Sequence, residues 1–460
     1  MEFTGRLVLV LGSGESGLAL ARHLAREGAR VRVADSRAQP PGIATVRALA
    51  GVEVVCGPFT ESLLDGVTLL AISPGLSQRE AVVQAAVRRG IPITGEIELF
   101  AQVLNAVRPR PKLIAITGTN GKTTTTSLMG ALCRAAGLET AVAGNISPAA
   151  LDEWLRRADE KRPAQAWVLE LSSFQLETVH SLAPDAASVL NISDDHLDRY
   201  TGLDDYAAAK ARIFDGAAAQ VLNRQDARVV AMRRAGMRVF TFGTDRPTQR
   251  DDFGVIDTRG VRWLARGQEP LLARDALPLA GEHNVANALA ALALGDAIGL
   301  PMPAMIEGLR NFRGLPHRVE KIAERGDGVR FYDDSKGTNV GATLAALEGL
   351  GCKVVLIAGG DGKGQDFTPL RDALAAHARA VILIGRDARR IAEAVAASGV
   401  ELVFADDLPT AVREANARAV PGDVVLLSPA CASLDMFRNY AHRAEVFCAA
   451  AWALPGVVRI

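Results

Sequence analysis

The sequence is poor in lysine, aromatic residues and cysteine, and it contains no long apolar run. Only eight of its 52 basic residues are lysines, so a lysine in a glycine-rich loop is informative. The five cysteines are odd in number and scattered, without a C-x-x-C pair, which indicates free thiols in a reducing compartment. No apolar stretch is long enough to cross a bilayer. We therefore expect a cytoplasmic protein with no membrane insertion.

A strong charge of either sign is also missing. The formal net charge is zero and no block of like charges occurs, which argues against nucleic acid as a partner. Small molecules are therefore the expected partners. A chain of 460 residues corresponds to about three domains of ~150 residues each, and we expect it to be a monomer.

Residues 6–37 are predicted to form a strand, a glycine turn, a helix and a second strand, which is half of a doubly wound sheet. The turn carries the pattern G-x-G-x-x-G, formed by Gly12, Gly14 and Gly17. Asp35 ends the second strand near the offset at which an acidic residue meets a ribose hydroxyl. The pattern alone favours an NAD site, but such a turn binds any pyrophosphate, and nothing downstream suits hydride transfer. A later strand ends at Pro74 and Gly75.

The stretch AITGTNGKTTTT is an apolar strand that continues into a glycine-flanked lysine and then a series of hydroxyls. Gly118 and Gly121 let the backbone N–H groups curl around a phosphate. Lys122 adds positive charge, and Thr123 offers an oxygen to Mg²⁺. The usual first glycine of such a loop is replaced by Ile116. The sequence therefore predicts a variant loop for a nucleoside triphosphate.

Four polar residues of this second block are candidates for the same site. Glu170 ends an apolar strand and can reach a phosphate-bound Mg²⁺, although a solvated strand end is the alternative. His196 follows the next strand among acidic residues, where a role in the site is favoured over a structural one. Lys210 stands alone on a predicted helix, and periodicity does not distinguish it from a surface lysine. Asn287, on a later helix, either reads a nucleotide base or caps the helix.

The last third of the chain repeats the pattern of strands that end in glycine, serine or charge, which predicts a second doubly wound sheet. Four candidate residues lie just past these strand ends: Lys336, Thr338, Lys363 and Ser433. Carboxyl ends of parallel strands meet at one edge, so these cations and hydroxyls are expected to converge on one crevice. Such a crevice suits an anionic substrate rich in carboxylate.

Nine motifs follow one another along the whole chain: T-G-T-N-G-K-T, E-L-S-S-F-Q-L, D-H-L-D-R-Y, the A-A-K of a predicted helix, H-N-x-x-N-A, G-L-P-H-R, D-S-K-x-T-N, G-G-D-G-K and S-P-A-C-A-S-x-D. Together they resemble the Mur ligases of peptidoglycan synthesis, whose ATP loop also lacks the first glycine. The resemblance implies an α/β protein with a Rossmann-like N-terminal domain, a central P-loop-type ATPase domain with a mainly parallel sheet, and a Rossmann-like C-terminal domain. The implied domains are residues 1–95 for the UDP substrate, 96–314 for ATP, and 315–460 for D-glutamate and for completing the ATP site.

The resemblance also implies the residues of each site. The ATP site would comprise Gly118, Thr119, Asn120, Gly121, Lys122, Thr123, Thr124, Asn287, Arg318, Asp334 and Lys336. The UDP-substrate site would comprise Gly14, Glu15, Ser16, Asp35, Ser36, Arg37, Pro74, Gly75 and Asn145. D-Glutamate would contact His196, Thr338, Lys363, Ser433, Leu434 and Tyr440. The metal ligands would be Thr123, Glu170, His196 and Lys210, and the catalytic residues would be Lys122, Glu170, His196 and Lys210.

The activity implied by the resemblance is ATP-dependent amide-bond formation in the synthesis of cell-wall precursors, which cell shape and division require. D-Glutamate would be added to UDP-N-acetylmuramoyl-L-alanine through an acyl phosphate, with two Mg²⁺ ions and a CO₂-derived carbamate on Lys210. The chain departs from the family pattern at Gly337, where alanine is usual, and at Tyr440, where phenylalanine is common. The loop between Tyr200 and Tyr206 is also short by a residue. The alternatives are a sister Mur ligase, a folylpolyglutamate synthetase-like amide ligase, and an NAD(P)-binding oxidoreductase.

Overall fold

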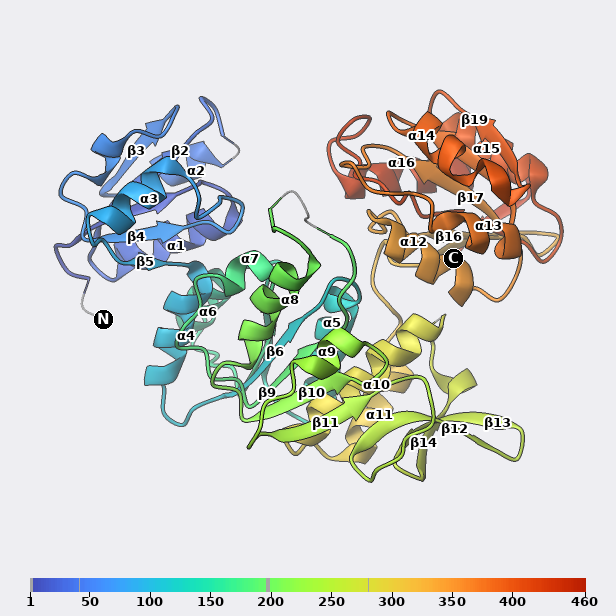
Figure 1. Ribbon diagram of the computed structural model, residues 1–460, viewed down its shortest axis with the longest axis horizontal. Helices are drawn as coiled ribbons and strands as arrows, with labels where there is room; N and C mark the ends of the chain where they lie inside the picture. The colour runs from blue at the N-terminus through green and yellow to red at the C-terminus, as the bar shows by residue number, and fades with distance from the viewer. Residues whose placement is uncertain (1–2, 41, 196–198, 280) are drawn as a thin grey trace. The chain divides into compact units, whose positions relative to one another are not determined.

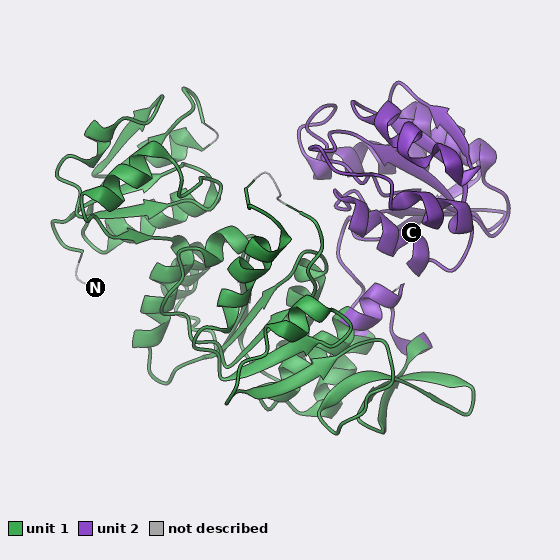
Figure 2. Ribbon diagram, viewed as in Figure 1, with its two compact units in different colours: residues 1–274, 287–310 green, residues 275–286, 311–460 purple. Residues whose placement is uncertain are grey.

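The computed structural model contains three β-sheets with helices packed on them, and it describes residues 3–40, 42–195, 199–279 and 281–460 (Figure 1). The chain divides into two compact units: residues 1–274 with 287–310, and residues 275–286 with 311–460 (Figure 2). The first unit holds two of the sheets and the second unit holds the third. The predicted α/β class with mainly parallel sheets is confirmed. The domain borders expected near residues 95 and 314 stay predictions.

The first sheet has five parallel strands in the order β3-β2-β1-β4-β5, drawn in blue in Figure 1. Its elements are β1 (Leu7–Leu11), α1 (Glu15–Arg26), β2 (Arg30–Asp35), α2 (Ile43–Arg47), β3 (Val52–Cys56), β4 (Leu69–Ile72), α3 (Ala81–Arg88) and β5 (Ile93–Thr94). β4 is buried along its whole length, as expected for a parallel strand covered on both faces. The strand order reverses between β1 and β4, and ligands of α/β sheets bind outside the carboxyl ends at such a point.

The second sheet has nine strands in the order β14-β13-β12-β11-β10-β9-β6-β8-β7. The strands are β6 (Lys112–Thr117), β7 (Thr140–Gly144), β8 (Ala166–Glu170), β9 (Ala186–Val189), β10 (Ala219–Asn223), β11 (Arg238–Phe242), β12 (Asp252–Thr258), β13 (Val261–Arg266) and β14 (Glu269–Ala273). The α-helices are α4 (Glu96–Ala106), α5 (Lys122–Ala135), α6 (Ala150–Asp159), α7 (Ser173–Leu176), α8 (Leu203–Ala211), α9 (Ala227–Ala231), α10 (Glu282–Ala297) and α11 (Met302–Asn311). The antiparallel edge β12-β13-β14 was not predicted from the sequence.

One apolar cluster connects the first two sheets. Buried residues of β1, α1 and β2 share it with buried residues of α4, β6 and β8. Helix α1 packs against α4 and α6, and the ring of Phe100 on α4 lies 4.7 Å from that of Trp167 on β8. The other face of the first sheet packs in a separate cluster that includes α3. The first two sheets therefore form one compact unit.

The third sheet has seven strands in the order β19-β18-β17-β20-β16-β15-β21, in which β15 pairs antiparallel with both of its neighbours. Its elements are β15 (Glu320–Arg325), β16 (Arg330–Asp333), α12 (Val340–Gly349), β17 (Val354–Gly359), α13 (Leu370–His377), β18 (Ala378–Ile384), α14 (Ala388–Val395), β19 (Glu401–Phe404), α15 (Leu408–Arg418), β20 (Val424–Leu427), α16 (Tyr440–Trp452) and β21 (Val457–Arg459). Two apolar clusters occupy this unit. Across the described parts of both units, no helix has the length and apolar character that a membrane span requires.

Candidate functional site

The loop between β6 and α5 turns the chain at the carboxyl end of a strand in the middle of the second sheet. Gly118 has φ +153° and Gly121 has φ +81°, conformations that favour glycine. A Cβ at Gly121 would lie 2.4 Å from Asn287 Oδ1, and a Cβ at Gly118 would lie 3.0 Å from the Cβ of Leu190. These contacts leave little space for any side chain in the turn. The turn leads directly into the N-terminus of α5, and the first N–H groups of a helix are able to bind a phosphate.

The loop is fastened to the segment that follows β9. The Thr119 hydroxyl donates to the Ser193 carbonyl at 3.2 Å and accepts from the Ser193 N–H at 3.0 Å. Asn120 and Asn191 exchange two hydrogen bonds of 2.8 and 3.0 Å. Sequence reasoning missed Asn191 and Ser193, because nothing in the chain pattern shows that the segment after β9 meets this loop. These bonds hold the phosphate loop in a fixed conformation.

Two lysines converge on one carbonyl of the loop. Lys122 Nζ donates to the carbonyls of Gly118 and Thr119 at 2.9 and 2.8 Å. Lys210 Nζ donates to the same Gly118 carbonyl at 2.9 Å and to the Thr117 hydroxyl at 3.4 Å. Lys210 is only 1% exposed, so the surface-lysine alternative is wrong. Burial and the neighbouring charge of Lys122 hold the pKa of Lys210 well below its usual range.

Glu170 closes β8 beside these lysines and is 2% exposed, so the alternative of a solvated strand end is wrong. Its Oε1 accepts a hydrogen bond of 2.7 Å from the Asn145 amide. Its Oε2 is buried, and no described residue donates a hydrogen bond to it. A buried carboxylate oxygen without a donor suits a cation. Together with the Thr123 hydroxyl in the first turn of α5, it offers the oxygen ligands that Mg²⁺ prefers.

Asn287 lies in the second turn of α10 and is 7% exposed. Its Oδ1 accepts a hydrogen bond of 3.2 Å from the Thr125 hydroxyl on α5. The helix-cap alternative is therefore wrong, and the side chain lies against the phosphate loop. His196 falls outside the described residues, so its assigned roles stay predictions.

The glycine turn of the first sheet is built around the Asp35 carboxylate, which is 3% exposed. Asp35 Oδ2 accepts from the N–H and the hydroxyl of Ser13 at 2.9 and 2.7 Å. Arg37 donates to both oxygens, from Nε at 2.9 Å and from Nη2 at 2.8 Å. Hydrogen bonds from Arg37 and Ser13 hold the pKa of Asp35 well below its usual range. In the same turn, a Cβ at Gly17 would lie 1.9 Å from the carbonyl oxygen of Gly12, so only glycine fits.

The other residues predicted for the UDP substrate gather at the reversal between β1 and β4. Gly14, Glu15 and Ser16 begin α1, Ser36 and Arg37 follow β2, and Pro74 and Gly75 follow β4. Asn145 lies in the loop after β7, and Ser147 of that loop donates to Glu15 Oε2 at 2.8 Å. One loop of the second sheet therefore contacts both the start of α1 and Glu170.

In the second unit, Asp334 is 6% exposed and its Oδ2 accepts from the Ser428 hydroxyl at 2.7 Å. Burial raises the pKa of Asp334 to about 7. A Cβ at Gly337 would lie 2.4 Å from Asp334 Oδ2, so this glycine leaves space for the carboxyl group in that position. Lys336 Nζ donates at 2.9 Å to the hydroxyl of Tyr440, a group that phenylalanine lacks.

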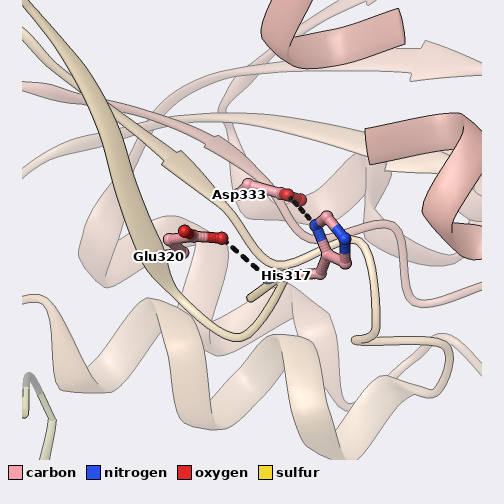
Figure 3. A group of neighbouring side chains, drawn as sticks. All are labelled: His317, Glu320 and Asp333. Atoms are coloured by element: carbon pink, nitrogen blue, oxygen red, sulfur yellow. Dashed lines mark hydrogen bonds and ion pairs between the residues drawn. The ribbon is translucent and has the colours of Figure 1, made fainter. Parts of the chain in front are cut away.

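His317 and Asp333 clamp the loop that carries Arg318 (Figure 3). His317 Nδ1 lies 2.6 Å from Asp333 Oδ2, and the His317 N–H donates to Glu320 at 2.9 Å. The hydrogen bond to Asp333 raises the pKa of His317. By residue type the three side chains are able to hold a cation, and their ligand atoms lie within 4.8 Å of one another. The contacts among these three residues hold the loop in its position, and His317 adopts a left-handed backbone conformation there, with φ +64°.

The residues predicted to bind D-glutamate lie in loops of the second unit. Thr338 precedes α12, Lys363 follows β17 with φ +49°, and Ser433 and Leu434 follow β20. Ser433 is 4% exposed, whereas Leu434 is 72% exposed.

Sequence reasoning missed Arg443, which is fully buried on α16 and connects two of these loops. Its guanidinium donates to the carbonyls of Cys431 and Ser335 at 3.1 and 2.8 Å.

Three family models match the chain in order. They are described as Mur ligase MurD-like N-terminal domain over residues 6–95, Mur ligase middle domain over 116–295, and Mur ligase glutamate ligase domain over 317–431. A protein of Aromatoleum aromaticum named UDP-N-acetylmuramoylalanine–D-glutamate ligase is 60% identical over 99% of this chain and 98% of its own length. A protein of the same name from Nitrosomonas europaea is 51% identical over 98% of this chain and 97% of its own length.

Solved structures share the fold at low identity. UDP-N-acetylmuramate-alanine ligase from Thermotoga maritima matches with a TM-score of 0.61 at 20% identity, covering 96% of this chain and 98% of the other. MurF from Acinetobacter baumannii matches with a TM-score of 0.61 at 20% identity, covering 97% of this chain and 90% of the other. This chain belongs to the Mur ligase family, as the sequence motifs predicted. The NAD(P)-dependent oxidoreductase alternative loses its support, because its glycine turn lies within the matched N-terminal ligase domain.

Proposed function

We propose that this chain is the ATP-dependent ligase that joins D-glutamate to UDP-N-acetylmuramoyl-L-alanine in the synthesis of peptidoglycan precursors. The observation that carries the proposal is the identity of 60% and 51%, over nearly the whole chain, to two proteins named for this reaction. The phosphate loop with Lys122 and the buried Glu170 supports it, because amide formation from a carboxylate requires activation by ATP.

The chemistry follows from the charges of the substrates. A carboxylate does not react with an amine, because its carbonyl carbon is electron-rich and oxide is a very poor leaving group. The substrate carboxylate oxygen therefore attacks the γ-phosphorus of ATP, and ADP leaves. The amino nitrogen of D-glutamate then forms a bond to the acyl carbon, loses a proton, and phosphate departs with the C–O bond electrons. The protein must position these groups and neutralise their charge.

Within the second sheet, the N–H groups at the start of α5 and the ammonium of Lys122 would hold the phosphates of ATP. The two lone pairs of Glu170 Oε2 and the Thr123 hydroxyl fit Mg²⁺, which when bound would neutralise phosphate oxygens. Asn287 would belong to the ATP site, where the Thr125 hydroxyl on α5 donates to its side-chain oxygen. The proposal includes two Mg²⁺ ions and a further ligand from His196.

Lys210 would carry a carbamate in the active enzyme. A cationic ammonium in this buried position would repel Lys122, and the lowered pKa of Lys210 frees its neutral amine. The nitrogen lone pair attacks the carbon of CO₂, one proton is released to solvent, and the product is an anion. The negative charge of the carbamate would balance the positive charge of Lys122, and its oxygens would bind the metal ion directly or through water.

The first sheet would hold the uridine diphosphate group, with Arg37 and the start of α1 at the pyrophosphate and Asn145 near the sugar. The third sheet would contribute Arg318, Asp334 and Lys336 to ATP. Its D-glutamate contacts would be Thr338, Lys363, Ser433, Leu434 and Tyr440. The five cysteines are free thiols, which fits a reducing compartment, and the proposal includes a cytoplasmic monomer.

The decisive experiment measures phosphate release from ATP in the presence of UDP-N-acetylmuramoyl-L-alanine and one amino acid at a time. D-Glutamate should support release, while L-glutamate and diaminopimelate should not. Lys122→Ala should remove the activity and confirm that it belongs to this protein. Release with diaminopimelate instead would assign the chain to a sister ligase, and release with none of the three would reject the proposal.

A further inference from the structure

Arg199 joins the first sheet to the second, and the motifs gave it no role of its own. It lies between β9 and α8 of the second sheet, yet its guanidinium donates to two carbonyls in the loop after β4 of the first sheet. Nη1 lies 3.1 Å from the Pro74 oxygen and Nη2 lies 2.7 Å from the Leu76 oxygen. The side chain is only 13% exposed. An arginine buried against two carbonyls of another segment holds that segment in one conformation.

Two residues at α7, a helix of the second sheet, hold the guanidinium in place. Glu177, at the end of α7, pairs with Arg199 Nη2 at 3.3 Å and accepts from the Tyr200 hydroxyl at 2.9 Å. The ring of Phe174 lies beneath the guanidinium, 4.1 Å from Cζ to the centroid. Gln78, in the loop after β4, donates to the Glu177 carbonyl at 3.3 Å. The contact therefore has a charge partner, an aromatic face and a second hydrogen bond across the same junction.

The same group of side chains reaches the phosphate loop. The Tyr200 ring stacks on Phe174 with centroids 5.9 Å apart and lies 5.3 Å from the Tyr206 ring. The Tyr206 hydroxyl lies 3.4 Å from Oγ1 of Thr119, a residue of the loop itself. A continuous row of contacts therefore runs from the loop after β4 to the phosphate loop.

The position of two carbonyls also fixes a donor that points the other way. The peptide group between Pro74 and Gly75 is planar and trans, so its C=O and N–H point in opposite directions. When Arg199 binds the Pro74 carbonyl, the Gly75 N–H must point away from Arg199. Gly75 is one of the residues predicted to contact the UDP substrate, and this N–H is its only backbone donor.

We propose that Arg199 is a positioning residue, which orients the Gly75 N–H for the uridine nucleotide and fixes this loop relative to the phosphate loop. The inference rests on the proposed function, since it assigns a further residue to the same substrate. An acceptor that is held by the first sheet must present its carboxylate to ATP on the second sheet. A loop free to rotate at Pro74 and Gly75 would lose that alignment, and the loss would fall on the UDP substrate and leave ATP binding unchanged.

Arg212 offers a matched control. Its guanidinium donates to the carbonyls of Leu176 and Val179 at 2.8 and 2.9 Å, so it makes the same kind of contact beside α7. Its partners lie within the second sheet's own elements. Arg212→Ala therefore removes two equivalent hydrogen bonds without touching the loop after β4.

The experiment compares Arg199→Ala, Arg199→Lys and Arg212→Ala in steady-state kinetics with each substrate varied in turn. Arg199→Ala should raise the KM for UDP-N-acetylmuramoyl-L-alanine about tenfold or more and leave the KM for ATP within about twofold. Arg199→Lys should recover part of the loss, because the ammonium can reach one of the two carbonyls. Arg212→Ala should lower the melting temperature without changing either KM.

Hydrogen exchange gives a readout that does not depend on turnover. Amides in residues 73–79 should exchange faster in Arg199→Ala than in Arg212→Ala. An unchanged KM together with unchanged exchange overturns the inference, as does an equal rise in the KM for UDP substrate and ATP. If the wild-type protein makes no product from D-glutamate, the proposed function fails, while calorimetric binding of UDP-N-acetylmuramoyl-L-alanine to both variants still tests Arg199.

Discussion

Asp35 and Glu170 are both buried carboxylates at the end of a parallel strand, each beside a glycine-containing turn, yet their partners differ. Both oxygens of Asp35 accept hydrogen bonds from Ser13 or Arg37. Glu170 accepts one bond from Asn145, and its second oxygen receives none from the described residues. The lone pairs of Asp35 are used by the protein itself, whereas those of Glu170 Oε2 are available to a cation.

The two turns also differ in charge. The first 111 residues contain no lysine, whereas the second turn brings Lys122 and Lys210 to one carbonyl. Under the proposed function, the two turns would bind phosphate groups in two different ways. The first turn is a rigid cradle of backbone and Arg37, suited to a pyrophosphate that does not react. The second adds the ammonium groups of Lys122 and Lys210 and a buried Glu170 oxygen without a described donor, as the proposed transfer of a phosphoryl group requires.

The removal of Lys210 tests the charge difference and has the largest expected effect. Lys210→Ala should lower kcat by about 10³-fold, because the metal site would lose the proposed carbamate. Small carboxylic acids such as formate should restore part of the activity by filling the vacated space. Lys210→Arg should not respond to them, since the guanidinium occupies the space and stays charged. Lys112→Ala, at an exposed position on β6, is the control, and full activity of Lys210→Ala in CO₂-depleted buffer would reject the carbamate.

The exchange of each carboxylate for its amide tests the comparison itself. Glu170→Gln should lower kcat by about 10²-fold and leave the KM for the UDP substrate unchanged. Asp35→Asn should do the opposite, raising that KM about tenfold through misplaced Arg37 and Ser13 while the KM for ATP stays the same. Steady-state kinetics with each substrate varied in turn separates the two patterns. Similar patterns in both variants would mean that the two carboxylates do not differ in role.

The rigidity of the first turn is tested by Gly17→Ala. Its Cβ would lie 1.9 Å from the Gly12 carbonyl, and the required backbone shift should lower the free energy of unfolding by about 2 kcal/mol. Gly14→Ala at the start of α1 is the control, because its added Cβ would meet no atom of the described residues within 4 Å apart from its chain neighbours. Urea unfolding of both variants gives the comparison. Equal stability of the two proteins would show that the turn is free to adjust.

The hydrogen bonds to both oxygens of Asp35 also have a smaller effect, a dependence of stability on pH. Its folded pKa is lowered by Arg37 and Ser13, so the carboxylate stabilises the fold above its unfolded pKa, and this contribution is lost as pH falls through the folded pKa. Asp35→Asn should therefore be less stable than wild type by about 1 kcal/mol at neutral pH. The difference should shrink below about pH 4. A difference that stays constant between neutral and acidic urea titrations would contradict the assignment.

The sequence predicted the strand ends well, because each apolar strand stops where glycine or charge begins and parallel strands place these ends at one edge. Lys122 and Glu170 were found in this way. Lys210 was not distinguishable from a surface residue, since its burial depends on packing against β6 from about 90 residues earlier in the chain. The family resemblance singled it out, and the structure shows that it is buried beside the charge of Lys122, while its role stays a prediction.

For Asp35 the sequence predicted a ligand contact but not the protein groups that bind the carboxylate. The spacing from the glycine turn suggested a bond to a ribose, but spacing says nothing about which neighbours already occupy the carboxylate. Arg443 gave no signal at all, because a buried arginine that donates to two loop carbonyls looks in sequence like any helical arginine. The antiparallel edge β12-β13-β14 was missed because its strands do not alternate regularly between buried and exposed residues.

The apolar cluster shared by α1 and the second sheet makes the first 95 residues a poor candidate for an independent fragment. Cut after Thr94, this piece would expose the face of α1 that packs on α4 and α6, and it would be prone to aggregate. Heating should therefore melt the first two sheets in a single cooperative transition. The C-terminal sheet, with its own two clusters, is free to melt at a different temperature.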